Sequence, residues 1–170
     1  FKVGSDTTKR LFGKKAKGCD ILISIHSNAA GDKINETIAY PIAFVPINGS
    51  ADTLGKLLAE CVEQTMGTKQ TSRSESKKSS KGDWDYYSVI NGAASVDVPG
   101  IILEHSFHTN TKATKWLMLD SNLDKLAKAE ADVIAKYFKY TVSSFVEIKL
   151  NFTCLRRIDP CRLRKAGIQN

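Results

Sequence analysis

Apolar positions gather in short runs that predict three strands. The segment "CDILISIHSN" holds an almost continuous aliphatic run over residues 21–25, the pattern of a strand buried on both faces. The segment "PGIILEH", residues 99–105, predicts a second short buried strand. Residues 36–46, "ETIAYPIAFVP", also read as a strand, and Pro41 within them predicts an edge position or a bulge.

Apolar residues at helical spacing, together with cap and stop signals, predict helices between and after these strands. A lysine-rich segment, Thr7–Lys17, reads as the end of a surface helix that Gly18 stops. A second helix has Ser50 and Asp52 as capping candidates and Gly67 at its end. Its apolar stripe comprises Leu54, Leu57, Leu58, Cys61 and Val62.

Two more helices are expected toward the end of the ordered pattern. Thr109–Lys115 leads into a helix around residues 116–119, and another begins at Ser121, with Asp124 completing a capping-box-like pair. The buried stripe of this last helix comprises Leu123, Leu126, Ala127, Ile134, Tyr137 and Phe138. Residues 68–82, which follow the helix that ends at Gly67, are polar and charged without an apolar anchor. This composition predicts a mobile or surface loop.

Strands that alternate with helices predict an α/β fold, an open sheet with helices on both faces. The pattern ends near residue 140. We therefore expect one domain over residues 1–140 and a basic tail or linker over residues 141–170.

Charge and cysteine usage add little that is specific. The net charge is +7, and residues 141–170 hold six basic and two acidic side chains. Such a tail fits either a polyanionic partner or a plain basic linker. No apolar run is long enough for a membrane span. The four cysteines lack zinc-finger spacing; Cys61 reads as a core thiol, and Cys154 and Cys161 could close a loop in an oxidising compartment.

Candidate chemistry lies where the two buried strands end, at His26 and at Glu104. In open α/β sheets, ligands bind beyond the carboxyl ends of the strands, so these two side chains are expected to approach each other. Imidazole is a good zinc ligand, and a carboxylate beside a zinc-bound water is a suitable general base. The alternative is that each is a polar strand end satisfied by hydrogen bonds.

The segments "GCDILISIHSNAAGD" and "PGIILEHSFHTN", with the closing helix "SNLDKLAKAEADVIAKYF", resemble the zinc-dependent N-acetylmuramoyl-L-alanine amidases of the amidase-3 family. The resemblance covers about residues 1–140. It implies an open twisted mixed sheet and hydrolysis of the amide between N-acetylmuramic acid and L-alanine in bacterial peptidoglycan. It also implies an extracellular or cell-wall location, in a bacterial autolysin or a phage-encoded lysin, with no specific nucleic-acid partner.

Residue by residue, His26 resembles the family's third zinc ligand and Glu104 its catalytic glutamate. Asn28 matches the asparagine of the S-I-H-x-N motif, which shapes a loop more readily than it contacts substrate. In the implied mechanism, zinc polarises the scissile carbonyl and activates a water. Glu104 takes the proton from that water and returns it to the leaving amine.

The chain departs from the family pattern upstream of this motif. The family's other two ligands are a histidine in G-H-G and a glutamate on the next helix, whereas this sequence has no histidine before His26 and no glutamate before Glu36. We therefore expect an amidase domain lacking the family's first strand and helix, with an incomplete zinc site. An unpaired sheet edge would then favour self-association.

Other polar and aromatic residues near the motifs have open roles. His105 follows Glu104 and should point to the opposite face of a strand, while His108 is either a loop residue or a contact at the site rim. Trp84, Tyr86 and Tyr87 fit either stacking on substrate or core packing. Two alternatives to a zinc amidase stay open: a non-catalytic cell-wall-binding or interaction protein, and another zinc hydrolase on a related sheet.

Overall fold

The computed structural model describes residues 5–139. The predicted tail over residues 141–170, with Cys154 and Cys161, lies outside the described residues. The elements along the chain are α1 (Ser5–Ala16), β1 (Leu22–Asn28), β2 (Ile42–Val45), α2 (Asp52–Met66), β3 (Arg73–Ser76), α3 (Ser88–Ala94), β4 (Gly100–Phe107), α4 (Thr111–Leu117) and α5 (Asp120–Tyr137). No helix within the described part is long and apolar enough to cross a membrane.

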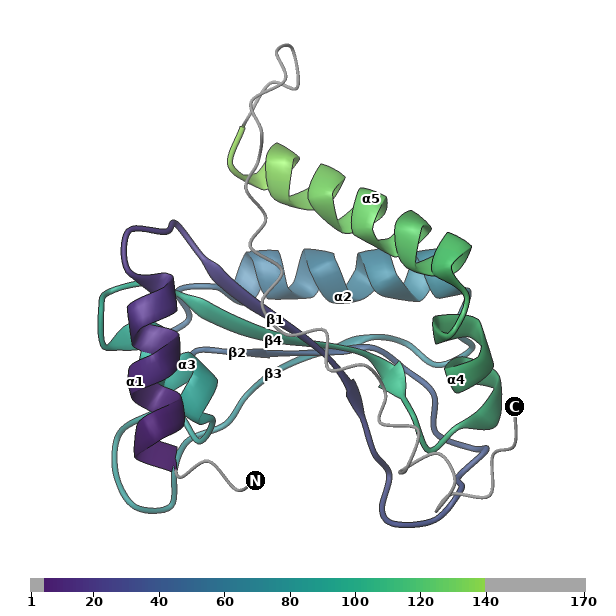
Figure 1. Ribbon diagram of the computed structural model, residues 1–170, viewed down its shortest axis with the longest axis horizontal. Coiled ribbons are helices and arrows are strands. Elements are labelled where there is room, and N and C mark those ends of the chain that lie inside the picture. Colours follow the sequence, from purple (N-terminus) through teal and green to yellow (C-terminus); the bar gives the residue numbers. More distant parts are fainter. Residues whose placement is uncertain (1–4, 140–170) are drawn as a thin grey trace.

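The four strands form one mixed sheet in the order β1-β4-β2-β3. β1 runs parallel to β4 and β2 parallel to β3, whereas β2 and β4 are antiparallel. Figure 1 shows the twist of this sheet beneath α2 and α5. The predicted fold class, an open mixed α/β sheet with helices on both faces, is confirmed.

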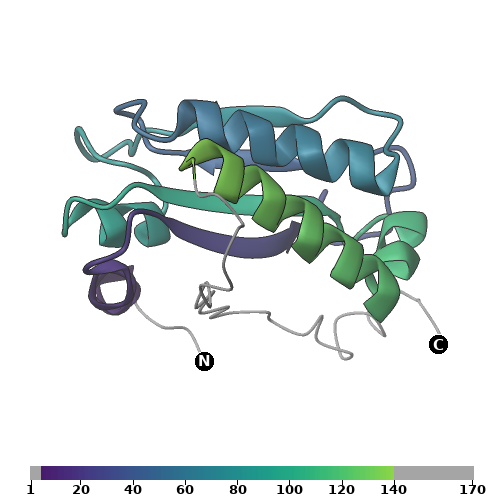
Figure 2. The ribbon, with the colours of Figure 1, turned by 90° about the horizontal axis from the view of Figure 1, so that it is seen from above.

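Helices α2 and α5 cover one face of the sheet side by side, as Figure 2 shows from above. The main core lies under them and is built from alternate residues of the strands, such as Ile101 and Leu103 of β4, with Leu54 and Leu58 of α2. Burial of these aliphatic side chains is the main stabilising term for this layer. Their alternation leaves Ile102 and Glu104 to the opposite face.

Helices α1 and α3 pack against each other at the amino ends of β1 and β4 (Figure 1). Two glycines allow this close approach. A Cβ at Gly92 would lie 2.5 Å from the Lys9 carbonyl oxygen, and a Cβ at Gly13 would lie 2.8 Å from the Gly92 carbonyl oxygen. The small side chains Ala16 and Ala93 continue the same contact. This pair of helices therefore covers only one end of the second face.

Several local expectations were wrong. β1 was expected to be buried on both faces, but in the described sheet it is an edge strand and only Ser24 within it is buried. Pro41 marks neither an edge nor a bulge: it precedes β2, an internal strand, and its carbonyl accepts a hydrogen bond from Arg73 N–H. Ser121 lies inside α5, whose N-cap is Leu119.

The polar segment 68–82 was expected to be a loop but contains β3. All four residues of β3 are exposed, so its backbone pairing with β2 rather than apolar burial makes it a strand. Helix α3 was not expected either. Its seven residues hold Ile90 and Ala93 in the core between small and polar neighbours, a pattern too short to show helical periodicity.

Candidate functional site

One line of paired positions crosses the sheet at the candidate site. His26 of β1 pairs with Glu104 of β4, Glu104 pairs with Ile42 of β2, and Ile42 pairs with Arg73 of β3. Directly paired residues of neighbouring strands point to the same face. The four side chains therefore share the face opposite α2 and α5, and the structure brings His26 and Glu104 together as expected.

The carboxylate of Glu104 is partly buried and poorly hydrogen-bonded. Its Oε2 atom is shielded from solvent and has no hydrogen-bond partner among the described residues. Burial raises the pKa of Glu104 to about 7, because a charged carboxylate is poorly solvated there. A carboxyl with such a pKa exchanges a proton readily near neutral pH, which is the property required of a general acid or base.

The ring of His26 is oriented by its own strand. Its Nε2 atom lies 2.7 Å from the Oγ of Ser24, two residues earlier on the same face. Ser24 is buried, so this contact fixes the imidazole against the sheet. The structure thus provides an oriented imidazole directly beside the carboxylate of the neighbouring strand.

His108 and Asn28 join the carboxyl ends of β1 and β4. The His108 N–H donates to the Asn28 carbonyl at 2.8 Å, and His108 Nδ1 lies 3.1 Å from the Ser27 carbonyl oxygen. The same Nδ1 atom also lies 3.2 Å from the Ser27 Oγ, so both contacts of this ring nitrogen are with Ser27. The Asn28 side chain accepts from the Ala29 N–H at 2.8 Å. Both residues shape the rim of the site; substrate contact by either stays a prediction.

His105 points to the other face of β4, as strand alternation predicted. Its Nε2 atom lies 2.7 Å from Glu130 Oε1 of α5, and both side chains are buried. The pair joins the site strand to the helix layer behind it. His105 is therefore a structural residue of β4 and does not line the candidate site.

Aromatic side chains form one wall of the site face. Phe44, two residues after Ile42, contacts Tyr87 with ring centroids 4.6 Å apart, and Tyr87 contacts Tyr86 at 5.1 Å. Burial and then the Glu104 carboxylate raise the pKa of Tyr87 to about 12. Tyr87 is half-buried beside Glu104, whereas Tyr86 is 54% exposed and Trp84 48% exposed. The last two are accessible for stacking, although their substrate contact stays a prediction.

Sequence reasoning missed Tyr40 and Arg73. Tyr40 packs edge-on against Phe107, and the Arg73 guanidinium lies 4.2 Å from the centre of the Tyr40 ring. The spacing of Tyr40, Ile42 and Phe44 at every second position was the available signal for an aromatic face. Arg73 offered no such signal because its place depends on the register of β3.

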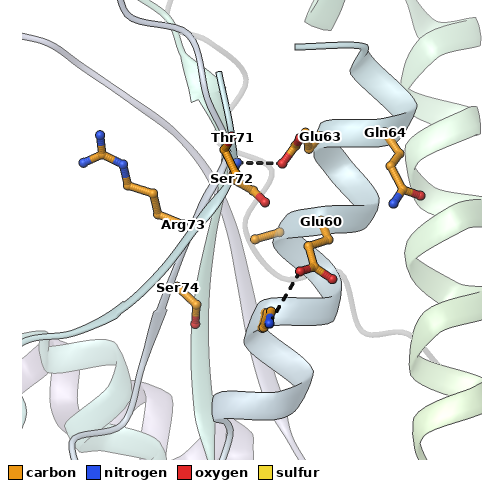
Figure 3. Close-up of a pocket in the computed structure, with 9 residues that line it drawn as sticks. Glu60, Glu63, Gln64, Thr71, Ser72, Arg73 and Ser74 are labelled. Carbon is orange, nitrogen blue, oxygen red and sulfur yellow. Dashed lines mark hydrogen bonds and ion pairs between the residues drawn. The ribbon is translucent and has the colours of Figure 1, made fainter. Parts of the chain in front are cut away.

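A separate hollow of about 630 Å³ lies between α2 and β3. Its lining includes Glu60, Glu63, Ser74 and also Arg73, and Glu63 accepts a hydrogen bond from the Ser72 N–H. Figure 3 shows the Arg73 side chain directed away from α2. The hollow therefore lies on the α2 side of the sheet, and the site of His26 and Glu104 is on the other.

The residues described here do not make a zinc centre. Within residues 5–139, no three His, Cys, Asp or Glu side chains are grouped closely enough to hold a metal ion. A zinc site uses three or four protein ligands, whereas this face offers one imidazole with the carboxylate that the resemblance assigns to proton transfer. The donor set in the described residues does not fit the ion.

Comparison with known proteins agrees with the fold. Residues 4–136 match the N-acetylmuramoyl-L-alanine amidase family, and the chain belongs to this family. The chain is similar to the CwlD amidase of Clostridioides difficile, solved in complex with the GerS lipoprotein, with 19% identity, a TM-score of 0.59 and coverage of 80% of this chain and 62% of that one. It thus spans less than two thirds of that amidase. No curated protein matches the chain.

Two further structures show the same fold. An N-acetylmuramoyl-L-alanine amidase from Clostridium difficile 630 is 14% identical with a TM-score of 0.60, covering 82% of this chain and 67% of that one. The catalytic domain of CwlV from Bacillus (Paenibacillus) polymyxa var. colistinus is 15% identical with a TM-score of 0.58, covering 83% and 69%. At these identities the likeness supports the fold alone.

Proposed function

We propose that the chain forms part of an enzyme that hydrolyses the amide between N-acetylmuramic acid and L-alanine in peptidoglycan. The observation that carries this proposal is the direct pairing of His26 with Glu104 on one face of an amidase-family sheet. Peptidoglycan is then the partner, and the bacterial cell wall or its exterior is the place of action.

Glu104 is the residue that moves protons in this proposal. As a carboxylate it takes a proton from a water that attacks the amide carbonyl carbon. As a carboxylic acid it then gives that proton to the leaving nitrogen while the C–N bond breaks. The products are the muramic acid carboxylate and a peptide with a free amino terminus. A pKa of about 7 keeps both forms of Glu104 populated near neutral pH.

The family resemblance implies zinc dependence. The proposal includes zinc only if further ligands come from outside residues 5–139. Among residues 5–139, His26 is the one that matches a family zinc ligand, and a single imidazole binds zinc weakly. A complete zinc site would need at least two more ligands from outside these residues.

The test compares the chain with a version extended at its amino terminus by the two segments that the family resemblance implies, a strand with the G-H-G histidine and a helix with the ligand glutamate. Zinc content and dye release from labelled peptidoglycan are measured for both. We expect the extended protein to bind about one zinc per chain and to release dye. An extended protein that folds but neither binds zinc nor releases dye would contradict the proposal.

A second candidate is a non-catalytic cell-wall-binding protein. The lack of any grouped metal ligands within residues 5–139 favours it. Sedimentation with insoluble peptidoglycan separates the two candidates when the chain and its Glu104→Ala variant are compared. Equal binding, with no hydrolysis by the chain or by the extended protein, would favour this second function.

We also propose that the chain self-associates through β1. Among the described residues β1 pairs with β4 only, so no described strand pairs with the backbone groups of its other edge. Analytical ultracentrifugation should show an average mass that rises with concentration, and Ile25→Lys, a charge on this edge strand, should reduce it. A monomer at all concentrations would contradict the proposal.

A further inference from the structure

We propose that Arg73 binds a free carboxylate on the peptide part of the substrate and so determines which peptides the site accepts. The inference rests on the proposed function and adds a specificity residue to it. Its basis is the placement of Arg73 on the face of Glu104, two strands away through Ile42. Because neighbouring strands lie about 4.8 Å apart, the Cα atoms of Arg73 and Glu104 are about 10 Å apart.

The guanidinium of Arg73 is held in a conformation suited to a carboxylate. Its Cζ atom lies 4.2 Å from the centre of the Tyr40 ring, and Tyr40 is held in turn by its edge-on contact with Phe107. Stacking uses the flat face of a guanidinium and leaves its N–H donors free at the edge. Those donors match the two oxygens of a carboxylate, a geometry that a lysine lacks.

Arg73 also remains accessible. Its side chain is 55% exposed, and its charged neighbour on the strand is Glu75, with 3.8 Å between Arg73 Nη1 and Glu75 Oε1. This distance exceeds that of a hydrogen bond, and an exposed ion pair of this kind is weak. A carboxylate of the substrate can therefore take the donors that Glu75 does not use.

The chemistry of the proposed substrate indicates which part carries this carboxylate. The carboxyl group of the muramoyl side is consumed in the scissile amide, so free carboxylates lie on the peptide side. An extended peptide advances about 3.3–3.6 Å per residue. With the scissile amide at Glu104, a carboxylate on the second or third residue of the peptide reaches Arg73. The preferred substrate is thus an acidic muramyl peptide.

The test measures binding without catalysis. Two muramyl tripeptides are used that differ only in whether the second residue carries a free carboxylate or a carboxamide. In the Glu104→Gln background, isothermal titration calorimetry should show about five- to twentyfold tighter binding of the carboxylate form. Arg73→Ala should abolish this preference, and Arg73→Lys should retain only part of it because the charge remains without the stacked fork.

Two further variants make the test specific. Glu75→Gln should strengthen binding of the carboxylate form, because a like charge is removed beside Arg73. Lys128→Ala removes the same unit of charge at an exposed position of α5, which covers the opposite face of the sheet, and it should leave the preference unchanged. Equal binding of both tripeptides, or a preference that survives Arg73→Ala, would overturn the inference. If the protein showed this binding preference but no amidase activity, the proposed function would be contradicted and the role of Arg73 in carboxylate binding would not.

Discussion

His26 and Glu104 occupy directly paired positions on β1 and β4, and their side chains share the sheet face opposite α2 and α5. The two residues lie far apart in sequence, so only the parallel pairing of the two strands brings them together. Glu104→Gln should lower amide hydrolysis by about 10²–10⁴-fold, because the amide keeps the shape but cannot accept the proton. Product formation by the amino-extended protein and its variant measures this loss, with circular dichroism as the control for folding.

Glu104 should also make stability depend on pH. Burial raises the pKa of Glu104 to about 7 from an ordinary value of 4.5. The folded chain therefore holds this proton more tightly than the unfolded chain. Its contribution to stability is complete below pH 4.5 and is lost as the pH rises to about 7.

Glu104→Gln should remove this loss and be more stable than the parent chain by about 2–3 kcal/mol above about pH 8. Denaturant unfolding of both proteins across about pH 4–9, with a chelator present, measures the difference. If the unfolding free energies of the two proteins changed with pH in the same way over this range, the pKa of Glu104 would not be raised in the folded chain. That result would contradict the prediction.

The buried pair of His105 and Glu130 should stabilise the contact between β4 and α5. Replacing one partner, as in Glu130→Ala, leaves the other polar group buried alone and should cost about 3 kcal/mol of unfolding free energy. The double variant His105→Leu with Glu130→Leu should recover most of this loss. Glu60→Gln, which breaks an exposed pair with Lys56, serves as the control and should change stability by less than about 0.5 kcal/mol.

Gly92→Ala should loosen the packing of α1 on α3. The added Cβ would meet the Lys9 carbonyl oxygen at 2.5 Å and Phe12 Cβ at 2.8 Å, so the helices must separate. A cost of about 1–3 kcal/mol is expected in thermal or denaturant unfolding. Ala94→Ser, at an exposed position of the same helix, should be nearly neutral. Equal stability of the two variants would show that α1 and α3 are not tightly packed at Gly92.

The sequence predicted the elements whose stability comes from apolar burial. The aliphatic run of β4 and the stripe of α2 are visible because Ile101, Leu103, Leu54 and Leu58 must all leave water. β3 was invisible because its exposed polar residues form a strand only through backbone pairing with β2. The same local pattern could not show that β1 has one neighbour instead of two in the described sheet.

The candidate site was predictable only where its residues lie at the ends of buried apolar runs. Polar residues at the ends of two buried runs indicated His26 and Glu104, because parallel strands bring their carboxyl ends together. Arg73 and Tyr40 could not be placed, since their approach depends on the register of β2 between β3 and β4. The partner of His105 was hidden likewise, because Glu130 comes from a helix whose rotation the strand pattern does not fix.

Mass spectrometry of the products formed from a muramyl tripeptide tests the central claim most directly. The amino-extended chain should release a peptide that begins with a free alanine amino group, and Glu104→Gln in the same protein should release almost none. Cleavage at another bond, or cleavage undiminished by Glu104→Gln, would contradict the assignment of this sheet face as an amidase site.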